Sequence, residues 1–207
     1  RDVLGFEPTP DQCRIAAACL CPPYRVLVKS GHNTGKSFTG AWLTNWRYDC
    51  WEPSASTTTA PTIVSVEKIV WAEIRMMRIR ANLPDDFIGP SAPEMRKGQD
   101  HYALGMTAST GEAFQGRHRE NQFFLFDESE DIDAVYWRVT NTMFQPGGKD
   151  LWVALCNPTT TTSQRYQEER AIGEDGQRKW TVIEVNSLDH PNVAAELAGL
   201  PAPVPNA

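Results

Sequence analysis

The sequence predicts an α/β fold of three layers, with helices on both faces of a mainly parallel central sheet. Short apolar runs with the character of buried parallel strands alternate with longer segments of helical periodicity. One such run, at 26–28, is followed by a glycine-containing polar loop, and another, at 123–126, by an acidic pair. At 207 residues, the chain is long enough to form one such domain with a proper core.

Composition and charge limit the classes of function. A formal net charge of -6 excludes a surface that is basic overall, so any contact with DNA must be local or shared among subunits. No apolar run approaches the length of a transmembrane helix and no signal peptide opens the sequence, so we expect no membrane partner. The five cysteines lack zinc-ligand spacing and are expected to be reduced thiols of a cytosolic protein.

The predicted elements of the first half begin with a short helix that ends near Ala18. Its start is marked by a capping box, with Thr9 as N-cap, Pro10 at the first helical position and Gln12 three residues after the cap. A strand at 26–28 then leads through a polar loop into an amphipathic helix. The core face of that helix is expected at Phe38, Ala41, Trp42 and Trp46. The threonine-rich stretch 54–60 is expected to be the second strand.

A long helix is expected from about 62 to 83. Its buried stripe is predicted at Val66, Val70, Ile74, Met77 and Ala81. The basic residues Lys68, Arg75 and Arg78 lie elsewhere on it and have two interpretations, a solvated face or a DNA-binding groove.

The second half is predicted to contain most of the sheet. The polar stretch 84–100 is expected to be a surface loop. Strands are expected at 102–107, 121–128, 151–156 and 179–186, and helices at 134–144 and 165–170. We assign residues 1–192 to one domain and 193–207 to a linker-like tail.

The loop after the first strand has the pattern of a phosphate-binding P-loop, or Walker A motif, which is flanked by a strand and a helix. Backbone N–H groups would point at nucleotide phosphates, Lys36 would neutralise the β- and γ-phosphates, and Ser37 would ligate Mg²⁺. The loop consists of Ser30, Gly31, His32, Asn33, Thr34, Gly35, Lys36 and Ser37. It departs from the pattern at one position, where Ser30 replaces the first glycine and Gly31 follows. The alternative is a fortuitous G-K-S sequence at a strand–helix turn.

The run NQFFLFDE has the form of a Walker B motif, an apolar strand that ends in two acids. Asp127 would hold Mg²⁺ through water, and Glu128 would orient and deprotonate the attacking water. The alternative is that the acids form a helix N-cap and a solvated acidic run, which continues through Glu130, Asp131 and Asp133.

Three further residues have both a structural and a functional interpretation. Gln12 either completes the capping box or reads adenine, since a carboxamide both donates and accepts a hydrogen bond. Phe6, a few residues upstream, would stack on the base. Asn157 follows the strand at 151–156 and either touches the γ-phosphate or its water, or forms a turn with Pro158.

The order of these motifs indicates a P-loop NTPase of the ASCE (RecA-like) group, with an extra strand between Walker A and Walker B and a catalytic glutamate. Most of the chain also resembles the large terminase subunit of tailed bacteriophages, the ATPase that packages DNA. The resemblance rests on FEPTPDQ, SGHNTGKS, TTTAPT followed by Trp71–Arg75, AFQGRH before FLFDE, and LCNPT.

The resemblance implies an ATPase motor domain that uses ATP and Mg²⁺ to move double-stranded DNA into a procapsid. It implies a portal protein and a small terminase subunit as partners, a homo-oligomeric ring when assembled, a monomeric isolated domain, and the host cell cytoplasm as location. It assigns Asn157 to the motif that couples hydrolysis to movement. It also implies an RNase H-like nuclease domain after this domain in the full-length protein.

The resemblance also implies an arginine finger. The family's P-loop often carries an arginine where this chain has His32, a poor substitute because a histidine is mostly neutral at pH 7. Arg117, ten residues before Asp127, is the best candidate and is expected to act in trans; Arg119 is the second candidate, and a plain surface role is the alternative. Two other functional classes remain open: a helicase-like or other nucleic-acid-dependent ATPase, and a non-catalytic nucleotide-gated scaffold.

Overall fold

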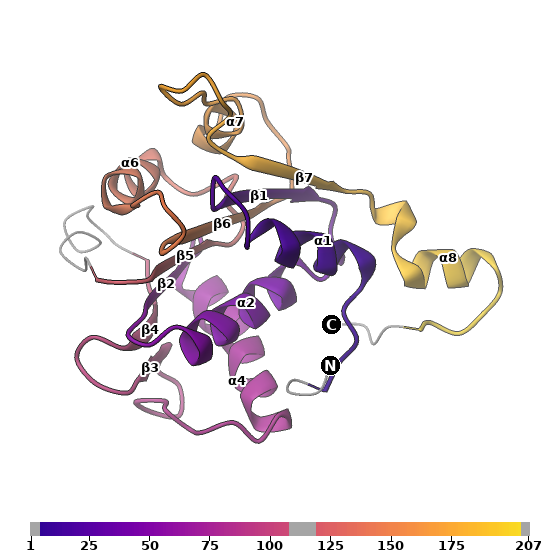
Figure 1. The fold of residues 1–207 in the computed structure, drawn as a ribbon. Helices are drawn as coiled ribbons and strands as arrows, with labels where there is room; N and C mark the ends of the chain where they lie inside the picture. Colours follow the sequence, from indigo (N-terminus) through magenta and orange to yellow (C-terminus); the bar gives the residue numbers. More distant parts are fainter. Residues whose placement is uncertain (1–4, 108–118, 204–207) are drawn as a thin grey trace.

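The computed structural model describes residues 5–107 and 119–203 of the chain (Figure 1). Within these ranges, one seven-stranded sheet has the order β3-β4-β2-β5-β6-β1-β7. The strands are β1 Arg25–Ser30, β2 Ala55–Thr59, β3 Glu94–Arg96, β4 Tyr102–Gly105, β5 Gln122–Phe126, β6 Leu151–Cys156 and β7 Thr181–Val185. All neighbouring strands are parallel except β3 and β4. The sheet is therefore mainly parallel, as predicted.

Helices cover both faces of this sheet (Figure 1). The helices are α1 Pro10–Ala18, α2 Lys36–Cys50, α3 Ile63–Ser65, the π-helix η1 Val66–Val70, α4 Trp71–Arg80, α6 Ala134–Met143, α7 Gln164–Glu169, the 3-10 helix η2 Ser187–Asp189 and α8 Pro191–Leu197. Helices α1, α2 and α4 lie on one face, and α6 and α7 on the other. This confirms the three-layer α/β/α architecture.

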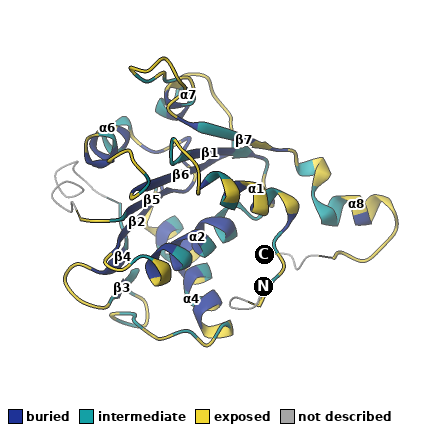
Figure 2. Cartoon of the chain, in the orientation of Figure 1, coloured by how far each residue is buried: buried dark blue, intermediate teal, exposed yellow. Residues whose placement is uncertain are grey.

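Successive side chains of the central strands point to opposite faces of the sheet, and this produces two separate cores. On β5, Phe123 and Leu125 pack with α1, α2 and α4, whereas Phe124 and Phe126 face the other layer. That second core is dominated by the buried indoles of Trp137, Trp152 and Trp180. Strands β5 and β6 are buried on both sides (Figure 2), which explains why their sequences are almost entirely apolar.

The long helix predicted from 62 to 83 forms as three consecutive segments, α3, η1 and α4. Its predicted stripe is buried at Val66, Val70, Ile74 and Met77, while Ala81 lies just past the end of α4 and is half-buried. The π-helical segment is not predicted by the periodicity. It is notable because π-bulges occur frequently at functional sites.

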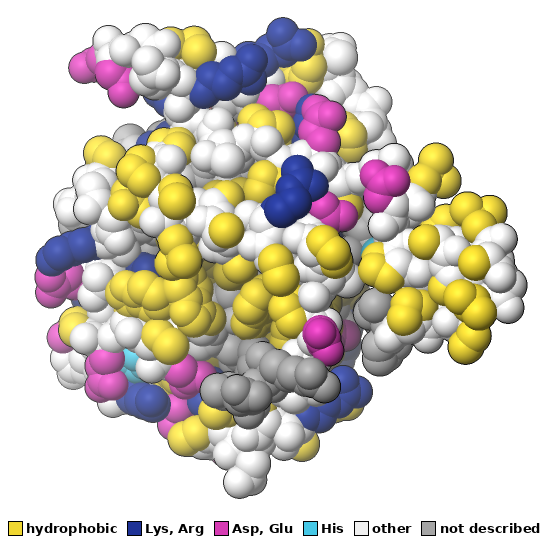
Figure 3. All heavy atoms as spheres, turned by 45° about the vertical axis from the view of Figure 1, so that its right-hand side comes forward, with side chains coloured by type: hydrophobic (Ala, Val, Ile, Leu, Met, Phe, Trp, Pro, Cys, Tyr) yellow, Lys and Arg dark blue, Asp and Glu magenta, His cyan; other side chains and the backbone are white. Residues whose placement is uncertain are grey.

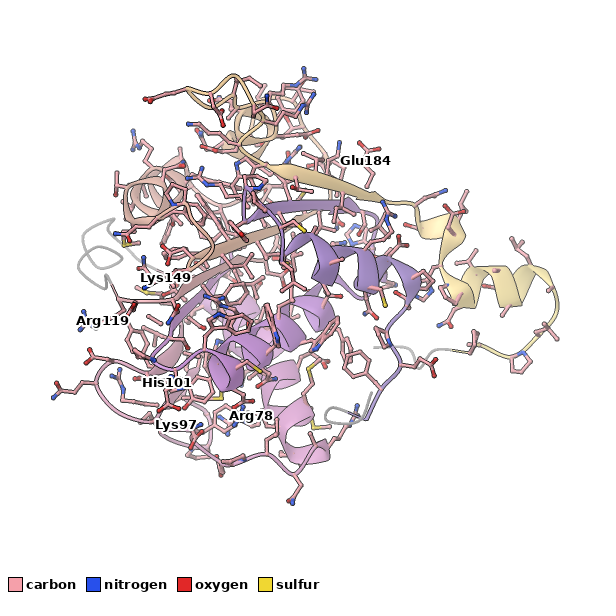
Figure 4. The ribbon with its side chains drawn as sticks, in the orientation of Figure 1. Arg78, Lys97, His101, Arg119, Lys149 and Glu184 are labelled. Carbon is pink, nitrogen blue, oxygen red and sulfur yellow. The ribbon has the colours of Figure 1, made fainter. Side chains whose placement is uncertain are left out.

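Arg78 corrects the expectation that the basic residues of this helix form a solvated face or a DNA groove. Its side chain is 1% exposed. The guanidinium donates to Asp49 Oδ2 at 2.9 Å and to the carbonyl oxygen of Pro84 at 2.9 Å, so it ties the end of α4 to α2 and to the following loop. Figure 4 shows Arg78 at the same end of the domain as Lys97 and His101. Lys68, by contrast, is exposed, which is compatible with both interpretations.

Two other segments differ from the prediction. The expected loop 84–100 contains β3, a three-residue edge strand that pairs antiparallel with β4. The expected tail from 193 begins inside α8, which projects from the body of the domain (Figure 1). Hydrophobic side chains gather on this projection (Figure 3), where Leu188, Leu197 and Leu200 are exposed. No helix within the described residues has the length and apolar character needed to cross a membrane.

The sheet order brings three loops to one edge. Strand β6 lies between β1 and β5, with Leu27 opposite Ala154 and Phe126 also opposite Ala154 from the other side. Because the three strands are parallel, their carboxyl ends meet at the same edge of the sheet. The expected extra strand between Walker A and Walker B is therefore β6.

Candidate active site

A pocket of about 490 Å³ opens at this edge of the sheet. It is lined by residues 32–38, by four acidic residues that follow β5 (Asp127, Glu128, Glu130 and Asp131), by Asn157 and Thr159 after β6, and by Ile69 and Glu73 of the long helix. Three separate loops and one helix thus face a common space.

The loop between β1 and α2 has the backbone of a phosphate-binding loop. Asn33 and Gly35 both have positive φ angles, 57° and 75°, which turn the chain sharply before α2 begins at Lys36. Gly35 has no side chain to cap the helix, so the first N–H groups of α2 remain directed toward the pocket. This geometry favours the P-loop interpretation over a fortuitous G-K-S sequence.

The departure from the glycine pattern has a structural explanation. The Oγ atom of Ser30 lies 2.6 Å from the Oγ1 atom of Thr34 and braces the loop from inside. A Cβ atom placed on Gly31 would lie 2.3 Å from the Oγ atom of Ser187, so a side chain at this position would have to displace that hydroxyl.

Lys36 lies at the centre of the site. Its Nζ atom donates to the carbonyl oxygen of Gly31 and to Asn157 Oδ1, the latter at 2.6 Å. Burial lowers the pKa of Lys36, and the nearby charge of Asp127 opposes this shift. The amide nitrogen of Asn157 lies 3.0 Å from His32 Nδ1. Asn157 is thus more than a turn residue, because its side chain links two parts of the P-loop.

Ser37 and Asp127 form an oxygen pair suited to a metal ion. Ser37 Oγ donates to Asp127 Oδ2 at 2.8 Å, and Asp127 is 2% exposed. Burial raises the pKa of Asp127, while the hydrogen bond from Ser37 opposes this rise, so a cation beside it would stabilise the ionised form. Among the described residues, no group of three or more His, Cys, Asp and Glu could hold a metal. Mg²⁺ fits the pair nevertheless, since it commonly takes one or two protein oxygens and completes its shell with phosphate and water.

Glu128 points into the same pocket from a strained backbone. Its φ angle is 49°, which is uncommon for a residue other than glycine. Its Oε2 atom accepts a hydrogen bond of 3.3 Å from Ser65 Oγ at the start of the long helix. Backbone outliers of this kind cluster at functional sites. The alternative of a helix cap does not hold for Asp127 or Glu128, because Asp133 caps α6 by accepting from Val135 N.

The capping box around Gln12 is confirmed. The backbone N–H of Thr9 donates to Gln12 Oε1 at 2.9 Å, and Gln12 N donates to Thr9 Oγ1 at 3.3 Å. The amide nitrogen of the same side chain faces the P-loop, since a Cβ atom on Gly35 would lie 3.2 Å from it. Phe6 packs edge-on against Phe38, with ring centroids 4.8 Å apart. Contact of Gln12 and Phe6 with a base stays a prediction.

Replacing Gln12 separates its two roles. We expect Gln12→Ala to weaken the binding of ATP more than the binding of GTP, because the carboxamide matches the N6 and N7 atoms of adenine. We also expect it to lower the free energy of unfolding by about 1 kcal/mol through loss of the cap. Gln12→Glu retains an acceptor for Thr9 N but cannot donate to N7, so it should retain the stability and lose the ATP preference. Calorimetric titration with both nucleotides measures the ratio. An unchanged ratio in both variants would remove Gln12 from base recognition.

Of the two arginines predicted as a finger, the structure describes only Arg119. Arg117 lies outside the described residues. Arg119 forms an ion pair with Asp100 Oδ1 at 2.8 Å and is not among the residues that line the pocket. Figure 4 shows Arg119 and Lys149 on the same side of the molecule.

Sequence reasoning misses several residues of the site. The acidic-run interpretation treats Glu130 as solvated, but it is 7% exposed. Ile69 and Glu73 reach the pocket from the π-helical segment and the turn after it, and Thr159 reaches it from the loop after β6. The only signal for Glu73 is its place within Trp71–Arg75, a stretch that carries the family resemblance.

The fold and the loop after β1 define the class of protein. A three-layer fold around a mainly parallel sheet, with a phosphate-loop backbone after β1 and an acidic pair after β5, is the P-loop NTPase fold. No protein-family model matches the sequence, and no curated protein matches it.

Solved structures that share this fold include large terminases. The Thermus phage P74-26 large terminase ATPase domain superposes with a TM-score of 0.67 at 15% identity, over 96% of this chain and 87% of that chain. The large terminase of a thermophilic bacteriophage gives a TM-score of 0.65 at 13% identity, over 87% of this chain and 46% of that one. The HK97 bacteriophage large terminase gives 0.66 at 12% identity, over 86% and 39%. The expected likeness is thus confirmed for the fold, and the chain spans less than half of the last two proteins.

Proposed function

We propose that this chain is the ATP-hydrolysing motor domain of a viral DNA-packaging terminase, which uses ATP and Mg²⁺ to move double-stranded DNA into a procapsid. The observation that carries the proposal is the convergence of Lys36, Ser37, Asp127 and Glu128 on one pocket at the carboxyl edge of the sheet. The shared fold with large terminases supports it, and the large terminase of the thermophilic bacteriophage has been solved with ADP and with ATP-gamma-S.

Each residue has a defined part in the proposed reaction. Lys36 and the first N–H groups of α2 would bind the β- and γ-phosphates. Ser37 and Asp127 would hold Mg²⁺, which when bound neutralises negative charge on the phosphates. Glu128 would orient a water molecule for in-line attack on the γ-phosphorus and accept its proton.

Asn157 would report the state of the pocket. Its side chain binds Lys36 at 2.6 Å, and a γ-phosphate would compete for the same ammonium group. Engagement of Lys36 by phosphate would therefore release the side chain of Asn157. This exchange of partners provides a physical basis for the coupling role that the terminase resemblance assigns to Asn157.

The proposed partners are double-stranded DNA, a portal protein and a small terminase subunit, with a homo-oligomeric ring as the working assembly in the host cell cytoplasm. A net charge of -6 fits DNA contacts that are shared among ring subunits rather than a basic surface on each one. We expect the isolated domain to be a slow, monomeric ATPase. Its specific activity should rise with protein concentration or with assembly on the portal, which sedimentation and phosphate-release assays can follow together.

Lys36→Ala tests the proposal directly. We expect ATP binding and turnover to be lost, because Lys36 would neutralise phosphate charge in the ground state and five acidic residues line the same pocket. Lys149→Ala serves as the matched control, since Lys149 pairs with Glu120 outside the pocket. Calorimetric titration with ATP and Mg²⁺ gives the affinities. Equal affinity of Lys36→Ala and the wild type would contradict the proposed function.

A further inference from the structure

A buried ion pair connects two of the loops around the pocket. Arg165 Nε donates to Glu130 Oε2 at 2.7 Å, and the two side chains are 1% and 4% exposed. Glu130 lies three residues after Asp127, and Arg165 lies in the first turn of α7. Neither residue has a part in the reaction as described above.

The pair holds the loop after β6 by its backbone. Glu130 Oε1 accepts from Thr160 N at 3.2 Å and from Ser163 Oγ at 2.9 Å. Arg165 Nη2 donates to the carbonyl oxygen of Thr160 at 3.3 Å. Both polar backbone groups of Thr160 are therefore bound. Between Thr160 and β6 lie Asn157 and Thr159, which line the pocket.

The same network reaches the strand that carries the P-loop. Arg165 Nη1 donates to Glu169, and Glu169 Oε1 accepts from Lys29 Nζ at 2.8 Å. Lys29 also pairs with Glu184 of β7 at 2.6 Å, and Ser30 of the P-loop follows Lys29 directly. A continuous chain of charged hydrogen bonds thus links the Walker B loop, the loop after β6 and the end of β1.

The charges on this pair are maintained at neutral pH. Burial would raise the pKa of Glu130, but hydrogen bonds from Arg165 and Ser163 outweigh it and lower the pKa below its usual value. Buried ion pairs commonly contribute little net stability compared with apolar residues of similar volume. The pair instead fixes the positions of the groups that it binds, because charged hydrogen bonds and the planar guanidinium group of arginine are directional.

We propose that Glu130 and Arg165 are positioning residues for the hydrolysis proposed above: by gripping Thr160, they hold Asn157 and Thr159 in place relative to Glu128. The inference rests on the proposed function for its effect on rate. The grip itself can be tested without turnover. Loosening the loop should slow the chemical step and leave ATP binding in place, since bound phosphate would replace Asn157 as the partner of Lys36.

The experiment compares Glu130→Gln with Glu168→Gln. Glu168 is a buried acid of α7, 8% exposed, whose partners are Asn141 at 3.0 Å and Trp180 at 3.1 Å. We expect Glu130→Gln to lower kcat by about tenfold to a hundredfold, the cost of a misplaced site, with KM within about twofold. Amide hydrogen exchange in 157–163 should rise by about tenfold, most clearly at Thr160. Glu168→Gln should change the melting temperature without changing kcat or the exchange of this loop.

Each outcome decides the inference. Unchanged exchange at Thr160 in Glu130→Gln would overturn the grip, and faster exchange with unchanged kcat would overturn the positioning role. If Glu130→Gln does not fold, Arg165→Lys replaces it; the charge stays but the fork is lost, and an intermediate loss of kcat with faster exchange is expected. A wild-type chain that binds ATP but never hydrolyses it would refute the proposed function, while the exchange comparison would still accept or reject the grip.

Discussion

Glu128→Gln is expected to bind ATP as tightly as the wild type and to hydrolyse it about 10² to 10⁴ times more slowly. Glu128 lines the pocket and accepts a hydrogen bond from Ser65. As the proposed general base, its carboxylate would act on the attacking water and would not contribute to binding of ATP in the ground state. Glutamine keeps the size and polarity of the side chain but cannot accept the proton. Single-turnover hydrolysis, measured beside calorimetric ATP titration, separates the two steps.

Glu120→Gln provides the matched control for this change. Glu120 is an exposed acid that pairs with Lys149 just before β5, at the opposite end of the strand from Glu128. Glu120→Gln removes the same charge and should retain full turnover. Near-normal hydrolysis by Glu128→Gln would remove Glu128 from the role of general base.

Arg117→Ala is expected to lower the turnover of the assembled protein by about 10³ to 10⁵, the usual effect of an arginine finger. Among the described residues that line the pocket, Lys36 is the only lysine or arginine, beside five acidic residues. Phosphoryl transfer therefore needs another positive group, and the terminase resemblance places it at Arg117. A finger in that position would reach a neighbour's nucleotide more easily than its own.

Mixing mutants tests the action in trans. Arg117→Ala subunits retain an intact pocket, and Lys36→Ala subunits retain the finger, so activity should return at mixed interfaces in an assembly of both. Comparable single variants at Arg119 test the second candidate, which pairs with Asp100. Two results would exclude the idea: no recovery in an assembly shown to be mixed, or full turnover by Arg117→Ala alone.

The main elements of the fold were predictable because the central strands are buried on both faces. Strands β5 and β6 are buried at every position and, apart from Gln122 at the start of β5, their sequences are continuous apolar runs. Strand β3 could not be predicted in this way, because Glu94–Arg96 is a short edge strand with one buried residue. The π-helical segment Val66–Val70 was also hidden, since Val66, Val70 and Ile74 keep ordinary helical spacing.

The site was predictable where its residues are contiguous in sequence. Lys36, Ser37 and Asp127 come from two motifs, and each motif carries its own strand and turn signals. Residues whose role depends on distant partners were not predictable. Arg78 can be buried because Asp49 and the carbonyl oxygen of Pro84 accept its hydrogen bonds. Glu130 can be buried because it accepts a hydrogen bond from Arg165, which lies 35 positions away in the sequence. Neither partner is indicated by a local pattern.

At Glu128, the left-handed backbone lowers folding stability, while the side chain is the one proposed to be needed for turnover. A non-glycine residue in this region of φ costs on the order of 1 kcal/mol, which the rest of the fold must offset. A chain selected for stability alone would place glycine or asparagine at this position. Thermostabilised forms of the domain should therefore be sought among substitutions away from this loop, because the most readily relieved strain in it belongs to the proposed general base.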